Sequence, residues 1–173
     1  IVGFVIGAYI GGVLNWVANG CEFSWKGLGY FGVGALAGAV GAGIGAGISS
    51  VMGGGAFGAG FLGTSAAKVA ATSFISGAAI GGGAGFSSGF TIGFGNGLMQ
   101  KQSFGDALWS GAKAGLIGGV SGALLGGVLG GIDASRHGRD FWDGFDYQNA
   151  LDNTIAKEGI NNANSRWLVA NKR

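Results

Sequence analysis

Glycines and large apolar residues recur along this chain with the period of an α-helix. One glycine run holds every fourth position for six members, and a second run has four members. Residues four apart lie on one helical face, so each run predicts a flat stripe of nearly bare backbone. The residues that we expect to mediate helix packing are Gly77, Gly81, Gly85, Gly89, Gly93, Gly97, Gly118, Gly122, Gly126, Gly130, Gly34 and Gly38.

Ridges of large residues accompany these stripes. In two of the predicted helices the ridge lies two positions from the glycines, about 200° around the axis. Stripes of small residues let helices approach closely, so that van der Waals contact and Cα–H···O bonds replace the burial of side chains. We therefore predict a mainly α fold of closely packed glycine-zipper hairpins with a polar helical C-terminal tail. The ridges are Leu36, Val40, Ile44 and Ile48, then Val120, Leu124, Val128 and Ile132, and, beside Gly3, Gly7 and Gly11, Val2, Ile6, Ile10 and Leu14.

One segment, residues 89–97, fits two structures. Phe86, Phe90 and Phe94 are four apart, which is helical spacing. Phe90, Ile92 and Phe94 also alternate as in a strand, and Asn96-Gly97 is a usable turn. We favour a helix.

Charge divides the chain near Asp133. The span Gly27–Ile132 carries only four charged residues, whereas Asp133–Arg173 carries twelve, six of each sign, with three glycines. We expect a Gly-rich apolar helical region over 1–132. We expect residues 133–173 to be a polar, charged helical tail or the start of a following domain.

The uncharged runs have lengths that suit a membrane. Ala114–Ile132 has 19 residues, and a helix needs about 20 apolar residues to cross a bilayer. Glycine and alanine add little transfer energy, however. Six strongly apolar residues within Gly29–Ile48 supply about −2 to −4 kcal/mol toward insertion. Eight glycines in that window oppose it, so both a membrane location and a soluble one stay open.

An internal repeat relates two parts of the chain at a separation of 84 residues. Trp25 pairs with Trp109, and each leads into a glycine-striped segment. Tryptophan near the end of an apolar helix is typical of a membrane interface, so we assign both to that role, with a core position as the alternative. Ser103 and Asp106 have the spacing of a helix N-cap before the second copy.

Composition excludes several classes of protein. Glycine makes up 42 of the 173 residues and proline is absent, which excludes collagen. Cys21 has no partner in the chain for a disulfide, and the net charge of +2 gives no case for nucleic acid. The chain opens at Ile1 without a methionine, so we expect a fragment or a processed product.

Residues for catalysis are few. His137 is the only histidine, and we interpret it as an exposed residue in a polar turn. Asp140 and Asp143 are three apart and fit a solvated helix start better than acid–base chemistry. Two Gly-x-Gly-x-x-Gly matches, at 27–32 and 53–58, are expected by chance at this glycine frequency. We predict no enzyme activity, no cofactor and no metal site; an enzyme that uses His137 is the weakest of our three hypotheses.

Several segments in Trp25–Gly144 are similar to one family. These are Phe94–Gln100, Gln102–Leu108, a glycine-striped helix ending at Asp133, and Arg139–Gly144. They resemble the Gly-rich segment that precedes the variable toxin in bacterial RHS-repeat-associated and other polymorphic toxin proteins. The resemblance implies a secreted antibacterial effector, with this part serving as a membrane-associating or translocation segment at a target-cell membrane, and it transfers no catalytic residue. From the glycine stripes on spans of membrane length we expect a segment that acts in anchoring, translocation or pore formation. We expect lipid as a partner, with a second copy of the chain or the rest of a larger toxin, and an immunity protein. A non-membrane spacer within a larger secreted protein is the alternative.

Overall fold

The computed structural model describes residues 2–62 and 72–158, and these residues form helices without strands. The predicted mainly α fold of closely packed glycine-zipper hairpins is confirmed, and residues 89–97 are helical. The tail beyond Glu158 lies outside the described residues. The helices are α1 (Val2–Ala18), α2 (Trp25–Met52), α3 (Phe57–Leu62), α4 (Phe74–Met99), α5 (Phe104–Arg136) and α6 (Tyr147–Glu158).

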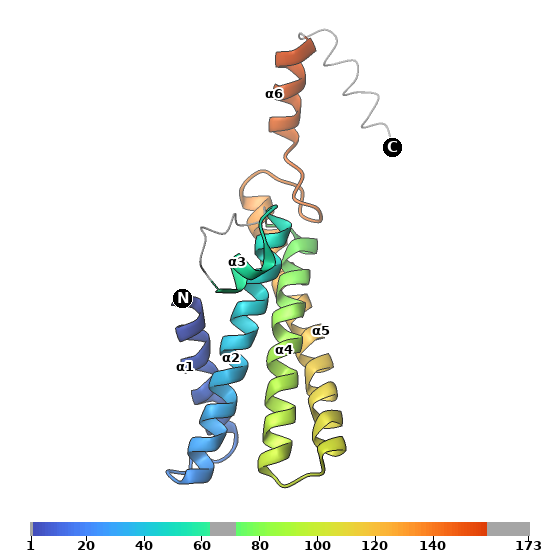
Figure 1. Cartoon of the computed structure of the whole chain (residues 1–173). Coiled ribbons are helices and arrows are strands. Elements are labelled where there is room, and N and C mark those ends of the chain that lie inside the picture. Colours follow the sequence, from blue (N-terminus) through green and yellow to red (C-terminus); the bar gives the residue numbers. More distant parts are fainter. Residues whose placement is uncertain (1, 63–71, 159–173) are drawn as a thin grey trace.

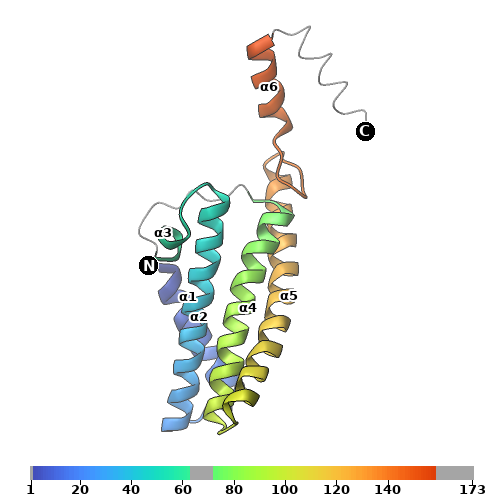
Figure 2. The same ribbon diagram turned by 45° about the vertical axis from the view of Figure 1, so that its right-hand side comes forward.

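The four long helices stand in a row and do not close into a bundle (Figures 1 and 2). Helix α1 packs on α2, α2 on α4, and α4 on α5, with successive helices antiparallel. The short α3 packs on α2, where the Phe57 ring covers Gly47, and Phe61 meets Phe4 of α1 edge to face at 5.5 Å between ring centroids. A row of this kind leaves two broad faces of the helices uncovered.

Serine side chains begin three of the helices. Ser24, Ser73 and Ser103 are the N-caps of α2, α4 and α5, and each accepts a hydrogen bond from a backbone N–H in the first turn. Ser103 accepts from the Asp106 N–H at 3.2 Å and donates to the Asp106 carboxylate at 2.7 Å. The spacing noted in the sequence is thus an N-cap in the structure.

The row has two different ends. The turn end contains the two short connections, residues 19–24 and 100–103, and the open end contains the last turn of α5 and the segment that leads to α6 (Figure 1). The charge change at Asp133 falls inside α5, which continues to Arg136. The suggestion that Asp140–Asp143 begins a helix is wrong. These residues form a turn, because the Asp140 side chain accepts from the Trp142 and Asp143 N–H groups.

Candidate functional site

The α4–α5 interface consists of two glycine stripes facing each other. The stripe of α4 pairs with α5 in a fixed antiparallel register, in which Gly77 opposes Gly126, Gly81 opposes Gly122, and Gly85 opposes Gly118. A Cβ atom on any of these six residues would lie closer than 3.0 Å to a backbone carbonyl oxygen of the opposite helix. The backbones therefore touch directly, and no residue larger than glycine fits without moving a helix.

The remaining predicted packing glycines also lie at helix contacts. Gly89 faces the Ala114 carbonyl, Gly93 faces Ser110, and Gly97 faces Ala107. Near the open end, Gly130 faces the carbonyl of Ser73.

The α1–α2 hairpin repeats this construction. Gly34 packs on the Gly11 carbonyl and Gly38 on the Gly7 carbonyl, again reciprocally. The 84-residue repeat in the sequence thus has a structural meaning. Gly34 and Gly38 correspond to Gly118 and Gly122, and in both copies the stripe packs against the helix that precedes it in the chain.

At a second set of glycines, an aromatic ring and not the backbone of another helix packs against the glycine. The Phe31 ring lies where a Cβ on Gly12 would be, and the Phe74 and Phe141 rings occupy the same position at Gly127 and Gly131. Along α4, Phe86, Phe90 and Phe94 stack with centroids 6.3 and 6.0 Å apart. Rings therefore fill the grooves that glycine leaves beside each stripe.

Polar side chains join the two hairpins. Asn15 of α1 is 5% exposed, and its amide donates to the Tyr30 carbonyl of α2 at 2.7 Å and to Asn96 Oδ1 of α4 at 3.0 Å. The Asn96 amide donates back to Asn15 Oδ1 at 2.8 Å. Farther along, the Ser88 hydroxyl of α4 donates to the Ala37 carbonyl of α2 at 3.0 Å. These bonds fix the register of three helices.

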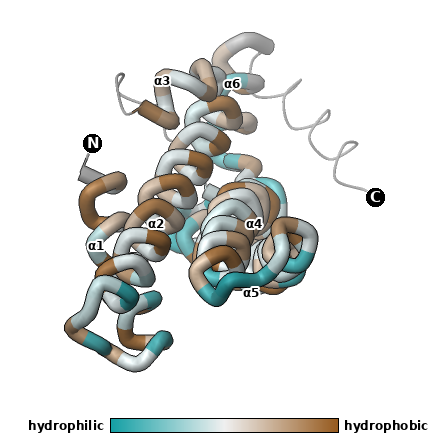
Figure 3. The backbone as a smooth tube through the Cα atoms, turned by 60° about the horizontal axis from the view of Figure 1, so that its bottom comes forward, coloured by the Kyte–Doolittle hydropathy of each residue, from teal (hydrophilic) through white to brown (hydrophobic). Residues whose placement is uncertain are grey.

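Small residues fill the interior of this fold, and large apolar residues lie on its surface. The buried apolar residues of the described chain are Tyr30, Ala37, Ala107 and Ala134, whereas thirty-one large apolar side chains are exposed. Figure 3 shows the hydrophobic positions recurring along the long helices, with polar residues gathered in the turns. The outward face of α5 carries the longest uninterrupted set: Leu116, Ile117, Val120, Leu124, Leu125, Val128, Leu129 and Ile132, each 40–70% exposed.

The three ridges differ in their surroundings. Ile6, Ile10 and Leu14 of α1 and the whole ridge of α5 are exposed. The ridge of α2 divides, because Leu36 is 59% exposed while Ile44 and Ile48 pack on Gly83 of α4.

Aromatic and basic residues mark the turn end. Trp25 is 89% exposed and Trp109 62% exposed, so neither is a core residue. Both lie at the start of a helix that begins at this end of the row. The Lys113 ammonium lies 5.1 Å from the Trp109 ring centroid, a cation–π contact.

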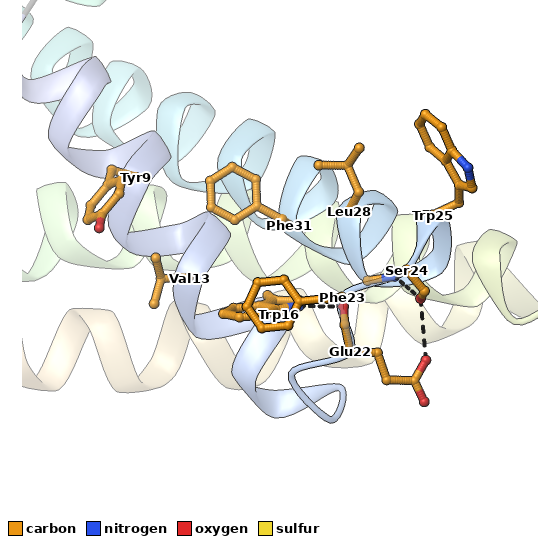
Figure 4. Close-up of a pocket in the computed structure, with 10 residues that line it drawn as sticks. Tyr9, Val13, Trp16, Glu22, Phe23, Ser24, Trp25, Leu28 and Phe31 are labelled. Atoms are coloured by element: carbon orange, nitrogen blue, oxygen red, sulfur yellow. Dashed lines mark hydrogen bonds between the residues drawn. The ribbon is translucent and has the colours of Figure 1, made fainter.

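A groove of about 690 Å³ separates α1 from the start of α2 near the same end (Figure 4). Tyr9, Trp16 and Phe31 are among its walls, and Glu22 is its one charged lining residue. The Trp16 indole N–H donates to the Glu22 carbonyl at 2.9 Å, and Ser24 lies 3.5 Å from the Glu22 carboxylate. The lining is mostly apolar, and the Ser24 hydroxyl is engaged as the N-cap of α2.

A clasp, residues 139–145, closes the open end. The Phe141 carbonyl accepts from the Phe74 N–H at 2.8 Å, and the Trp142 carbonyl accepts from the Ile75 N–H at 3.0 Å. Both N–H groups lie in the first turn of α4, where the helix itself provides no acceptor. The Phe74, Phe141 and Trp142 rings form one cluster with centroids 4.9–5.8 Å apart. Gly144 has a φ of +76°, a backbone conformation that favours glycine, and a Cβ added there would lie 3.1 Å from the Ser73 Cβ.

His137 is the C-cap residue of α5 and has a 57% exposed side chain. Its Nδ1 lies 2.8 Å from the Asp133 carbonyl and 3.5 Å from the Asp133 carboxylate, which also accepts from the Thr72 hydroxyl. Asp140 and Asp143 are engaged in their own turn. Within the described residues no group of three or more metal-ligating side chains gathers. The glycine motif at 27–32 lies within α2, which is a helix and not a phosphate loop.

Comparison with family models, curated proteins and solved structures finds no match for this chain. Two of the helices, α2 and α5, are long and apolar enough to cross a membrane by length and composition.

Sequence reasoning missed three features of the site. The Asn15–Asn96 pair joins residues 81 positions apart, and isolated asparagines carry no pairing signal. The Phe-on-Gly contacts depend on the helix order, and the clasp depends on a turn that the pattern did not distinguish from a helix. A signal was available only for the clasp, since Gly138 and Gly144 interrupt a polar segment.

Proposed function

We propose that this chain is a membrane-associating glycine-zipper segment that acts in anchoring, translocation or pore formation. The observation that carries the proposal is that glycine and alanine lie inside the fold while large aliphatic residues lie on its surface. In water such a surface is a liability, because soluble monomers rarely expose large contiguous apolar patches. In lipid, outward aliphatic residues are favourable, and close backbone contact holds the helices together.

The lengths of the helices also suit a lipid bilayer. At 1.5 Å per residue, the uncharged run of α5 between Lys113 and Asp133 is about 30 Å long, close to the hydrocarbon thickness of a bilayer. Its eight outward aliphatic residues contribute about −2 to −5 kcal/mol toward insertion. Helix α1, with 17 residues, is at the lower limit of a spanning length.

The ends of the row suit the polar boundaries of a membrane. Trp25 and Trp109 are exposed at one end, where indole rings favour the headgroup region. Trp142 and Tyr147 are exposed at the other, beside Arg136 and Arg139, whose charges complement anionic lipid phosphates.

The biological setting comes from the resemblance described above. The segments similar to polymorphic toxins support a bacterial secreted effector that associates with a target-cell membrane. Its partners would then be lipid and either a second copy of the chain or the remainder of a larger toxin, with an immunity protein opposing it.

One observation favours the spacer alternative. Helix α4 falls outside the helices that qualify as membrane spans, since Gly, Ser and Thr make up much of it. In the spacer, the outward faces would pack against other parts of a larger secreted protein instead of lipid.

Flotation with dye-loaded liposomes separates the two functions. We expect the wild-type chain to float with the vesicles. The Gly122→Leu variant, whose new side chain meets the Gly81 carbonyl, should lose stable association and any dye release. Gly32→Leu is the matched control, because a Cβ at Gly32 meets nothing within 4 Å.

Each outcome has a distinct meaning. Flotation with dye release supports a pore or translocation role, and flotation without release supports an anchor. A wild-type chain that stays soluble, monomeric and helical without detergent, and that does not float, would leave only the spacer.

A further inference from the structure

The two ends of the row differ in what they would meet in a membrane. Helices α1 and α2 are joined at the turn end, and so are α4 and α5. The open end instead holds the last turn of α5, the clasp and the segment that leads to α6 (Figure 1). Four antiparallel helices thus return the chain to the side from which α1 starts.

We infer that the row enters a bilayer with its turn end leading, so that residues 19–24 and 100–103 cross to the far leaflet while the clasp and α6 stay on the near side. This inference rests on the proposed membrane function. It names the surface that each leaflet meets: aromatic turns on the far side, and a charged clasp with its polar helix on the near side.

Charge distribution gives the direction. Of the 18 formal charges in the chain, nine fall within residues 133–158, which form the open end and the segment that continues from it, and three more follow Glu158 in the sequence. The turn end carries Glu22, Lys26, Lys101, Asp106 and Lys113. Charged groups cross hydrocarbon at a high cost in free energy, so the end with fewer of them crosses more readily.

Part of the polar backbone at the turn end is bonded internally. The Cys21 N–H donates to the Trp16 carbonyl at 3.1 Å, and the Gln102 N–H donates to the Gly97 carbonyl at 3.0 Å. Backbone groups that are satisfied within the turn need less water during transit.

Exposed rings lie beside both turns. Phe23 is 97% exposed and Trp25 89% exposed at the first turn, and Phe104 is 68% exposed at the second. The Phe23 ring meets the Trp16 ring edge to face at 4.9 Å between centroids, so aromatic groups would reach lipid first.

Cys21 makes the arrangement testable, because this native thiol is exposed in the first leading turn and is the only cysteine in the chain. The full chain is added to preformed liposomes of phosphatidylethanolamine and phosphatidylglycerol, and floated vesicles are treated with a maleimide on a polyethylene glycol chain too large to pass a pore that releases dye. The matched variant, Cys21→Ser with Ser135→Cys, places the thiol at the exposed open end of α5. Both proteins are also labelled in detergent, where both thiols should react.

We expect Cys21 to be protected in vesicles until detergent is added, and Ser135→Cys to label without detergent. Labelling of both sites on floated protein, protection of both, or the reversed pattern would each overturn the leading-turn arrangement while leaving membrane association intact. Failure to float would remove the membrane function itself, and with it this inference.

Discussion

Glycine serves in this protein as a contact surface. Each interior glycine costs up to about 1 kcal/mol of helix stability relative to alanine, so stripes of it need compensation. The compensation is visible at Gly81 and Gly122, where each backbone carbonyl lies against the opposite glycine. Weak Cα–H···O bonds of about 0.5–1 kcal/mol add to the van der Waals contact at such sites. Gly32, in contrast, faces open space, so no helix contact offsets its cost.

This difference predicts opposite effects of one substitution at two glycines. Gly81→Ala should destabilise the folded chain by about 1–3 kcal/mol, because the added methyl group meets backbone that cannot rotate away. Gly32→Ala should stabilise it by about 0.5–1 kcal/mol through helix propensity. Thermal unfolding followed by circular dichroism in detergent micelles measures both. An equal gain in stability from both substitutions would show that the α4–α5 contact is looser than described.

At the scale of elements, the hairpins are the units and asparagine connects them. The α1–α2 and α4–α5 hairpins each close by glycine contacts, and the α2–α4 joint between them also uses side chains. Asn15 contacts both α2 and α4, which makes it the polar centre of that joint. Hydrogen bonds between membrane helices contribute about 0.6 kcal/mol on average and up to about 1.7 kcal/mol.

A double-mutant cycle tests this joint. Asn15→Ala and Asn96→Ala should show a coupling free energy of about 0.6–1.7 kcal/mol, because each amide bonds the other. Asn96→Ala with Ser50→Ala is the control, since Ser50 lies at the opposite end of the row and the two effects should add within about 0.5 kcal/mol. Additivity in the first pair would mean that the two amides do not bond in solution.

The clasp makes a separate prediction for hydrogen exchange. Phe141→Ala removes the ring that fills the space beside Gly131, so the carbonyls of 141 and 142 should release the first turn of α4. The amides of Phe74 and Ile75 should then exchange faster, and those of the α4 interior should not. Trp25→Ala, at the other end of the row, should change neither set. Unchanged exchange at Phe74 in Phe141→Ala would show that the clasp does not cap α4.

Sequence periodicity was sufficient for the hairpins but not for their assembly. The stripe of Gly118 and Gly122 indicates a helix with one flat face, and the structure shows that face against α4. Periodicity does not indicate which helix lies opposite, so the register with Gly85 and Gly81 could not be read from the sequence. The Asn15–Asn96 bond and the ring contacts depend on how the helices are paired, so they could not be predicted from the sequence either.

The whole molecule is a row of helices whose broad faces stay open. A closed bundle would bury the ridges of α1 and α5, but here Leu14 is 63% exposed and Leu124 59% exposed. The buried positions are instead mostly glycine, alanine and serine, with Tyr30 and Asn15 as the large exceptions. Under the proposed membrane function, lipid would accept these aliphatic side chains, and the two ends, with their aromatic and charged residues, would lie at the boundaries of the bilayer.

The most direct test is to measure whether the outward face of α5 contacts lipid or water. A spin label at Leu124→Cys, in a Cys21→Ser background with vesicles, reports collisions with oxygen, which concentrates in hydrocarbon, and with a water-soluble nickel chelate. A membrane-embedded row predicts frequent collisions with oxygen and rare ones with nickel at this site, and the reverse at Ser135→Cys in the same background. Frequent nickel collisions at Leu124→Cys would contradict the central claim that this aliphatic face lies in lipid.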